Sequence, residues 1–296
     1  MPTLSIVINT KNCADTLEVC LQSVVGADEI IVVDMESTDE TVLIAQQYTD
    51  AIYSFVDVGY ADPARNFAFS KTSGDWILIV DADEVIPDEL WNKVQSVIHE
   101  PQADIYRIPR RNSMFGYWMT DTGWWPDFQV RLFRNGSVVW NEGVHSQPVF
   151  QGAVADFPSD KKLAIEHYNF SSIAEYLERL DRYTTVAAQS QTTVANPITG
   201  LARLQSEQLR RLFAQNGIAD GFHGVALSYL QAFYEFVVEL KKWEIQGFTQ
   251  GNEPESCIAQ LRDWQKQLNY WIADREVKQS SGLRRIYWQL RRRLRW

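Results

Sequence analysis

The sequence has few cysteines and no long apolar run. Its 296 residues include only Cys13, Cys20 and Cys257, a sparse and odd set that has neither a disulfide framework nor a metal-ligand spacing. This favours a reducing cytoplasm. No segment has about 18 or more uninterrupted apolar residues, so we expect no membrane-spanning helix. Residues 1–4 lack the basic start of a signal peptide, which also favours the cytoplasm.

Basic residues are outnumbered by acidic ones. The chain has 28 Lys and Arg against 38 Asp and Glu, a net charge of −10. An acidic surface argues against nucleic acid as a partner, because the phosphate backbone attracts basic proteins. The charge is uneven, since residues 284–296 hold six arginines and no acid. An acidic body with a basic end indicates a separate partner for that end.

The first 110 residues alternate between strand and helix patterns. The composition, with 45% hydrophobic and 22% charged residues, is that of a globular protein long enough for one α/β domain and an appendage. Apolar strands separated by helices predict a mostly parallel sheet covered on both faces. The capping-box spacing of Ser37 and Glu40 predicts the start of one helix. Strands are predicted at 4–8, 29–34, 51–56, 76–80 and 104–109, and helices at 14–25, at about 37–48 and from about 88.

Beyond residue 110 the pattern changes. Residues 111–160 are rich in Trp, Gly and Pro and contain one clear strand pattern, at 129–134. Residues 172–243 have helical patterns, and 246–257 has the composition of a loop. We therefore predict three regions, with boundaries 1–165, 166–245 and 246–296.

The sharpest motif is the acidic run Asp81-Ala82-Asp83-Glu84, directly after the predicted strand at 76–80. Ligands of open parallel sheets bind beyond the carboxyl ends of the strands. Acids that emerge there from a buried strand are costly unless a positive group meets them. A divalent cation that carries a diphosphate meets this need, because hard cations prefer oxygen ligands. The alternative is a solvated loop that also caps the following helix.

Polar residues also follow the two neighbouring strands. Asp34 ends the second strand, and Thr10 and Asn12 follow the first. These strand ends present polar groups to one crevice, where a carboxylate can accept hydrogen bonds from a base or a ribose. The sequence contains no G-x-G-x-x-G and no P-loop lysine motif, so neither a dinucleotide fingerprint nor an NTPase cradle is supported.

Four segments, taken together, resemble glycosyltransferase family 2. They are LSIVINTKN, IIVVDMESTDET, ARNFAFSKTSGDWILIVDADE and WWPDFQVRLFRNG, in the expected order. The branch that the chain resembles most is that of the bacterial lipopolysaccharide-core β-glucosyltransferases, over about residues 3–245. The resemblance implies a Rossmann-like GT-A domain at 1–165 for nucleotide-sugar binding and catalysis. It also implies a helical region at 166–245 that completes the acceptor side, followed by a linker and a basic amphipathic helix at 246–296.

The resemblance also implies a role for each motif residue. Asp127 is the expected catalytic base, and His145 is a candidate further metal or phosphate contact. On the donor side, Asp34 is expected at the uracil or ribose with Thr10 and Asn12 beside it, Arg65 at the base or phosphates, Asp81 at the ribose, and Asp83 at a Mn²⁺ or Mg²⁺ ion. Trp124 and Trp125 are expected to stack on a sugar or an acceptor.

Each of these roles has a structural alternative. Asp127 fits a turn acid after a proline, and the two tryptophans fit core packing under a loop. His145 fits a structural histidine, and His167 is expected to be structural, with a phosphate contact as its alternative. The family pattern also differs at Met35 and Glu36, which narrow the nucleotide site, and at residue 146, where relatives often carry Glu and this chain has Ser.

The expected reaction is a direct displacement with inversion at the anomeric carbon. A carboxylate takes the proton of the acceptor hydroxyl, and the metal stabilises charge on the leaving diphosphate. The donor is expected to be a UDP-sugar with a glucose-like sugar, and the acceptor a saccharide or lipid-linked saccharide of the cell envelope. A sugar nucleotidyltransferase and a non-catalytic, membrane-bound scaffold that binds sugar nucleotides remain alternatives.

The last residues have the pattern of an interfacial helix. If residues 283–294 are helical, their leucines, isoleucine and tyrosine line one face and arginines line the rest. With Trp288 and Trp296, this pattern is typical of a helix that lies on an anionic membrane surface. A solvated tail or a contact between subunits is the alternative. We expect the protein to be peripheral on the inner face of the plasma membrane.

Overall fold

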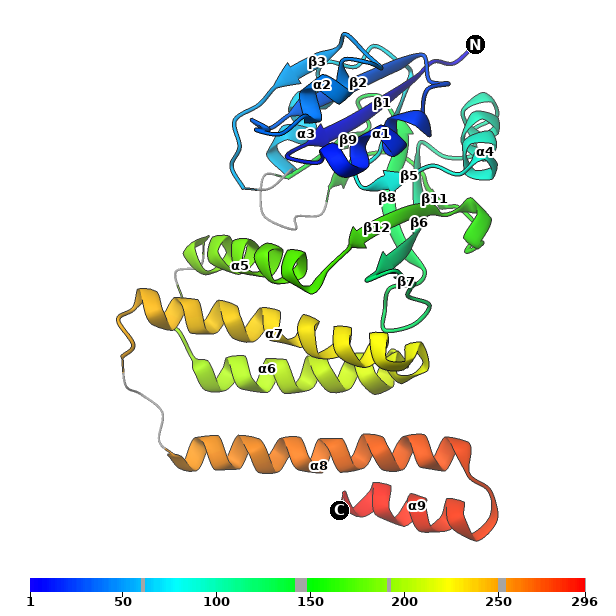
Figure 1. Ribbon diagram of the computed structural model, residues 1–296. Coiled ribbons are helices and arrows are strands. Elements are labelled where there is room, and N and C mark those ends of the chain that lie inside the picture. Colours follow the sequence, from blue (N-terminus) through cyan, green and yellow to red (C-terminus); the bar gives the residue numbers. More distant parts are fainter. Residues whose placement is uncertain (60–61, 142–147, 191–192, 250–253, 296) are drawn as a thin grey trace. The chain divides into compact units, whose positions relative to one another are not determined.

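The chain folds into two compact units (Figure 1). The computed structural model describes residues 1–59, 62–141, 148–190, 193–249 and 254–295. The first unit, here the sheet unit, comprises Met1–Trp118 and Trp124–Ser171. The second, here the helical unit, comprises Met119–Gly123 and Ser172–Trp296. The short segment Met119–Gly123 therefore interrupts the chain of the sheet unit and belongs to the other one.

The parallel half of the sheet is formed by the first four strands, in the order β3-β2-β1-β4. Their bounds are β1 Leu4–Thr10, β2 Glu29–Asp34, β3 Ile52–Ser54 and β4 Trp76–Ile79. The apolar side chains of β1, β2 and β4 are buried on both faces, as the near-continuous apolar runs predict, whereas the edge strand β3 is only partly buried. The register places Thr10 opposite Asp34, so the polar ends of β1 and β2 lie side by side.

The second half of the sheet is mostly antiparallel. Strand β8, Asp127–Arg134, lies between β4 and β6, Ile105–Met114, and is antiparallel to both. Strand β12, Ile165–Phe170, is parallel to β6 and antiparallel to β5, Glu84–Val85. Further short pairs are β7 Tyr117–Trp118 and β11 Val154–Asp156 on β6, and β9 Val138–Val139 with β10 Val149–Phe150.

The predicted α/β architecture is confirmed, with corrections to its details. The sheet is mixed, because β8 inserts between two strands that precede it in sequence. The end of the first region, predicted at residue 165, lies too early, because β12 follows it and belongs to the sheet. The helix predicted over 37–48 is shorter, α2 Thr41–Ala45, because Ser37 accepts a hydrogen bond from the Asn12 amide and does not cap it.

Helices cover both faces of the sheet. They are α1 Ala14–Gln22, α3 Asp62–Phe69 and α4 Asp88–His99, with the 3-10 turn η1 at Lys161–Leu163. Leu17 of α1 and Leu90 of α4 pack with the even-numbered side chains of β1. Ala64 and Ala68 of α3 pack on the opposite face, where Val7 points. Burial on both faces fixes the register of β1 and thereby the positions of the strand ends.

The described part of the helical unit is built mainly from five α-helices. They are α5 Ile173–Ser190, α6 Pro197–Leu209, α7 Gly221–Ile245, α8 Pro254–Gln279 and α9 Gly282–Leu294. A π turn, Arg210–Ala214, and a 3-10 turn, Gly217–Asp220, connect α6 to α7. The start of α8 corrects the prediction of a loop over 246–257. None of the helices in the described ranges is both long and apolar enough to cross a bilayer.

Polar contacts hold the helical unit together. Glu239 and Lys242 form a buried ion pair on α7 at 2.9 Å. The Asp220 carboxylate is 2% exposed and accepts hydrogen bonds from the backbone and side chain of Thr120, the amide of Asp121 and the hydroxyl of Thr122, all at 2.9–3.0 Å. These bonds attach Met119–Gly123 to the start of α7.

A candidate active site at the strand ends

The carboxyl ends of β1 and β2 form a polar wall. The Thr10 hydroxyl donates to Asp34 Oδ1 at 3.1 Å, and Asp34 Oδ2 accepts from the Ser37 amide at 3.0 Å. Asn12 adopts a left-handed backbone with φ 47°, and its Oδ1 accepts from the Thr38 amide at 2.8 Å. The loops after the two strands are thus tied together. A hollow of about 380 Å³ lies beside Asp34.

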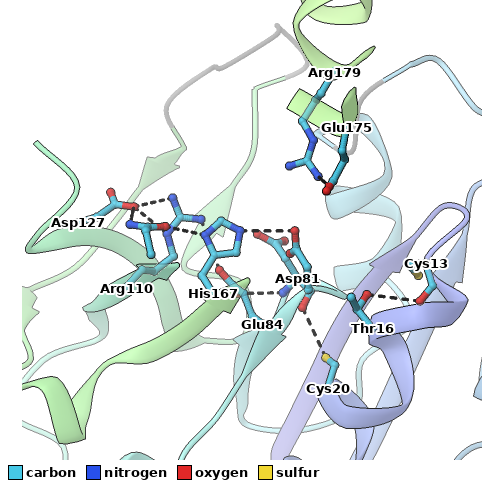
Figure 2. Close-up of polar contacts among 12 residues, drawn as sticks. Cys13, Thr16, Cys20, Asp81, Glu84, Arg110, Asp127, His167, Glu175 and Arg179 are labelled. Atoms are coloured by element: carbon cyan, nitrogen blue, oxygen red, sulfur yellow. Dashed lines mark hydrogen bonds and ion pairs between the residues drawn. The ribbon is translucent and has the colours of Figure 1, made fainter. Parts of the chain in front are cut away.

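Asp81, just after the end of β4, is held between two arginines. Figure 2 shows its contact with Glu84, whose Oε2 accepts from the Asp81 amide at 2.9 Å. Its Oδ2 lies 2.5 Å from Arg131 Nη2, and its Oδ1 lies 3.2 Å from Arg65 Nη2. The same Arg131 nitrogen lies 2.6 Å from Glu84 Oε1. Burial alone would raise the pKa of Asp81, but the charges of Arg131 and Arg65 outweigh it and hold that pKa well below its usual value. Asp81 is therefore ionised at neutral pH.

Asp127, at the start of β8, is bound by a third arginine, Arg110. Arg110 donates to Asp127 Oδ2 through Nε at 2.9 Å and Nη2 at 2.6 Å. Oδ1 accepts one hydrogen bond, from Gln129 at 2.7 Å. Burial raises the pKa of Asp127, but the charge and hydrogen bonds of Arg110 outweigh it, so the pKa is lowered. The carboxylate is ionised, and Oδ1 keeps a lone pair for a further donor.

Asp83 and His167 face each other across β5 and β12. Their closest atoms are Asp83 Oδ2 and His167 Nε2, 3.5 Å apart. The backbone fixes this pairing, because the Tyr168 amide donates to the Asp83 carbonyl at 3.0 Å. The other ring nitrogen, Nδ1, lies 2.6 Å from Asn112 Oδ1. The described ranges contain no group of three or more His, Cys, Asp or Glu able to hold a metal. Asp83 and His167 can thus supply two ligands, and a diphosphate and water would supply the rest.

The sheet unit brings most of the predicted residues to these strand ends. Trp124 contributes its carbonyl oxygen, which accepts from Asn112 at 3.0 Å, and Trp125 packs edge-on against Trp118 with ring centroids 5.7 Å apart. Arg65 also lies over the Trp140 ring, 4.7 Å from its centroid. His145 lies outside the described residues. The roles proposed for these side chains toward donor, metal and acceptor stay predictions.

Sequence reasoning gave no role to Arg110, Asn112 and Arg131, which link the acids. Glu84 was found as part of the acidic run, and His167 was expected to be structural. One signal was available, since Arg110 and Asn112 alternate along a strand and so share a face. His167 reaches the site because β12 pairs with β6 and β5, and no local sequence pattern predicts that pairing.

Comparison with known proteins assigns the family. The family model described as Glycosyl transferase family 2 matches residues 5–150. Residues 5–150 form a family 2 glycosyltransferase domain. An uncharacterized glycosyltransferase from Rickettsia felis is 28% identical to the chain over 252 residues, covering 80% of this chain and 88% of the relative. The lipopolysaccharide core biosynthesis glycosyltransferase LpsC from Rhizobium meliloti is 25% identical over 236 residues, covering 76% and 86%.

Among solved structures, the chain is similar to TarS residues 1–349 from S. aureus, crystallised in complex with UDP. The sequence identity is 17% and the TM-score is 0.45. The alignment covers 83% of this chain and 92% of TarS. The family model thus confirms the predicted family for residues 5–150, and this domain is that of a glycosyltransferase.

Proposed function

We propose that this glycosyltransferase moves a glucose-like sugar from a UDP-sugar to a hydroxyl of a saccharide or lipid-linked saccharide, with inversion and with the help of Mn²⁺ or Mg²⁺. The observation that carries the proposal is the arrangement of acids at adjoining strand ends of the family 2 domain. Asp34, Asp81 and Asp83 follow β2 and β4, and Asp127 begins the neighbouring β8. In open sheets this edge binds the ligand. The likeness to LpsC supports an acceptor of the cell envelope.

On the donor side, the chain offers hydrogen-bond acceptors for the ribose or base and positively charged side chains for the phosphates. Asp34 is fixed by Thr10 and the Ser37 amide, so it can accept hydrogen bonds without first being ordered. Arg65 and Arg131 keep Asp81 ionised. Asp83 and His167 fit a divalent cation, because carboxylate oxygen and imidazole nitrogen are both ligands of such ions. The bound cation would supply charge stabilisation for the leaving diphosphate.

On the acceptor side, Asp127 takes the proton of the attacking hydroxyl. Arg110 and Asn112 bind Oδ2, and the lone pair left on Oδ1 receives the hydroxyl. A carboxylate of lowered pKa is a weak base at equilibrium. It suffices when the proton moves late, as the bond to the sugar forms and the hydroxyl becomes acidic.

Calorimetric titration of UDP with and without Mn²⁺ tests the donor site. Wild type should bind UDP more tightly with Mn²⁺, and Asp83→Ala should lose this gain. Asp156→Ala, which removes an exposed acid paired with Arg107, is the matched control and should behave as wild type. Absence of UDP binding under both conditions would refute the UDP-sugar donor.

Turnover with UDP-sugars tests the chemistry. Asp127→Asn should keep UDP binding and lose about 10²–10⁴-fold in kcat, the usual contribution of a general base. If wild type binds UDP but neither transfers the sugar of any UDP-sugar nor hydrolyses the donor, a non-catalytic scaffold is favoured.

We also propose an anionic membrane surface as a partner, through α9. This helix packs against α8 with its polar side, where Arg292 pairs with Asp274 at 2.8 Å and Arg284 pairs with Glu276 at 2.9 Å. Five of its apolar side chains are 53% to 85% exposed. They are Leu283, Ile286, Tyr287, Leu290 and Leu294. The helix thus presents an apolar stripe between arginines, the arrangement of an interfacial helix.

The positive charge of α9 favours an anionic lipid surface over a second copy of the chain as its partner. Two α9 helices packed by their apolar faces would bring together two sets of five arginines. An anionic surface instead attracts them, while tyrosine and tryptophan rings suit the headgroup level. Such binding is consistent with a position on the inner face of the plasma membrane, where a lipid-linked acceptor would be available.

Sedimentation with vesicles tests the lipid partner. Wild type should bind vesicles of phosphatidylcholine with phosphatidylglycerol, more weakly at high salt, and should not bind pure phosphatidylcholine. Ile286→Gln with Leu290→Gln should weaken binding about tenfold or more without changing charge. Leu261→Gln, at an exposed leucine of α8, is the control and should have no effect. Equal binding by all three proteins would refute the role of α9.

A further inference from the structure

Asn112 connects the candidate metal ligands to the candidate base. It lies on β6, and its side chain is fully buried. Its Nδ2 lies 3.0 Å from the Trp124 carbonyl oxygen and 3.2 Å from Asp127 Oδ2. Its Oδ1 lies 2.6 Å from His167 Nδ1. One amide therefore contacts the residue that faces Asp83 and the residue proposed to take the proton.

These contacts allow one orientation of the amide. A backbone carbonyl and a carboxylate only accept hydrogen bonds, so the NH₂ group of Asn112 must face them. The amide oxygen must then face His167, and it can only accept. Nδ1 of His167 is therefore the ring nitrogen that carries hydrogen. In a neutral imidazole with hydrogen on Nδ1, the Nε2 atom holds a lone pair.

That lone pair points at another acceptor. Nε2 lies 3.5 Å from Asp83 Oδ2, and both residues are held by the pairing of β12 with β5. With the ring neutral, both atoms are acceptors, and a divalent cation bound to both would use the two lone pairs. Two adjacent ligands that each lie about 2.1 Å from one ion are roughly 3.0–3.4 Å apart, close to the separation here. The geometry fits one divalent cation with only a small adjustment.

We propose that Asn112 is a positioning residue that fixes the His167 ring so that Nε2 and Asp83 together bind the divalent cation. The same amide holds Asp127 Oδ2, so one side chain sets both ends of the site. The inference deepens the proposed function and rests on it. Metal-bound histidines commonly donate their second N–H to an oxygen that fixes the ring, and the loss of such a partner weakens metal binding about 10–100-fold.

The first test measures Mn²⁺ directly, by electron paramagnetic resonance of the free ion, with and without UDP. His167→Gln should weaken Mn²⁺ binding in the presence of UDP by at least tenfold, while UDP binding without metal stays unchanged. His99→Gln, on α4, is the matched control. If wild type binds UDP and Mn²⁺ and His167→Gln binds both equally well, His167 is not a ligand and the inference fails. If wild type binds no UDP, the proposed function fails instead.

Two variants of Asn112 separate its two contacts. Asn112→Asp keeps an oxygen for His167 but removes the donor to Asp127, so Mn²⁺ affinity should stay within about threefold while kcat falls. Asn112→Ala removes both contacts, so Mn²⁺ affinity and kcat should both fall, the former by about tenfold or more. Equal Mn²⁺ affinity in Asn112→Ala and wild type would refute the positioning role.

A direct reading of the tautomer covers the case in which the Asn112 variants do not fold. The chain has four histidines, so a long-range ¹H–¹⁵N spectrum of protein labelled in histidine resolves each ring, and His167→Gln assigns one of them. Neutral His167 should carry hydrogen on Nδ1, and its Nε2 signal should broaden selectively with Mn²⁺. Hydrogen on Nε2 alone, or broadening that spares this ring, would overturn the inference.

Discussion

Replacing Arg131 with methionine should destabilise the sheet unit strongly, because Arg131 neutralises two acids at once. Its Nη2 lies 2.5 Å from Asp81 and 2.6 Å from Glu84, and the side chains of Arg131 and Glu84 are 4% and 0% exposed. Methionine fills similar space but leaves the two carboxylates facing each other. Breaking a buried pair from one side costs about 3–5 kcal/mol, since a buried charge loses its partner. Arg65 still lies 3.2 Å from Asp81 and Arg110 lies 3.4 Å from Glu84, so the cost should be near the lower end, about 3 kcal/mol. We expect a loss of that size.

Arg134→Met provides the matched control on the same strand. Arg134 pairs with Asp104 at 3.1 Å, but the two side chains are 44% and 39% exposed. It also lies over the Trp76 ring, 4.7 Å from its centroid. An exposed ion pair and one cation–π contact together contribute about 1 kcal/mol. The same chemical change three residues away should therefore cost several-fold less.

Urea denaturation followed by circular dichroism measures both variants. The pH dependence of the stability loss in Arg131→Met is a second check. Asp81 has a lowered pKa, so its contribution to the free energy of unfolding is present above its ordinary pKa of 3.8 and is lost as pH falls through the lower, folded value. The deficit of Arg131→Met should thus be largest near neutral pH and shrink below about pH 4. Equal free energies of unfolding for the two variants at pH 7 would refute the reasoning.

Two further results are expected. Asp220→Asn should lower the free energy of unfolding by roughly 3–6 kcal/mol in the same assay. An NH₂ group would replace a carboxylate oxygen that accepts two hydrogen bonds, and a hydrogen bond to a charged group is worth about 1.5–3 kcal/mol. A loss below about 1 kcal/mol would contradict this expectation. At saturating Mn²⁺, the acid limb of kcat/KM that Asp127 contributes should lie below about pH 4, because Arg110 lowers the pKa of Asp127 below 3.8. A limb centred above pH 6 that does not move with Mn²⁺ concentration would exclude Asp127, in this environment, as the base.

The parts of the fold that depend on local patterns were predictable from the sequence. The runs at 4–8, 29–34 and 76–80 are apolar enough to be buried on both faces, and each is a strand of the parallel half. The insertion of β8 between β4 and β6 was not predictable, because strand order is set by long-range packing. The first turns of α8 were missed because residues 254–257 are polar and begin with proline, a composition shared by loops and helix starts.

The residues of the candidate site also fall into a predictable and an unpredictable group. Asp34, Asp81 and Asp83 could be found because they directly follow strand patterns, and the ends of adjacent parallel strands share an edge. Arg110 and His167 were missed because each arrives on a strand whose place in the sheet has no local signal. Their effect is electrostatic and positional, so only the folded structure reveals which acid each one serves.

The interruption of the sheet unit at Met119–Gly123 has a consequence for synthesis on the ribosome. Thr120 emerges 100 residues before Asp220, the acceptor of its hydrogen bonds. At roughly 5–20 residues per second, roughly 5–20 s pass before the two can meet. All strands of the sheet have been made by residue 170, within this interval. The nascent chain can therefore complete its sheet while this segment still awaits its partner, and a fragment that stops at residue 171 would keep it in that unfinished state.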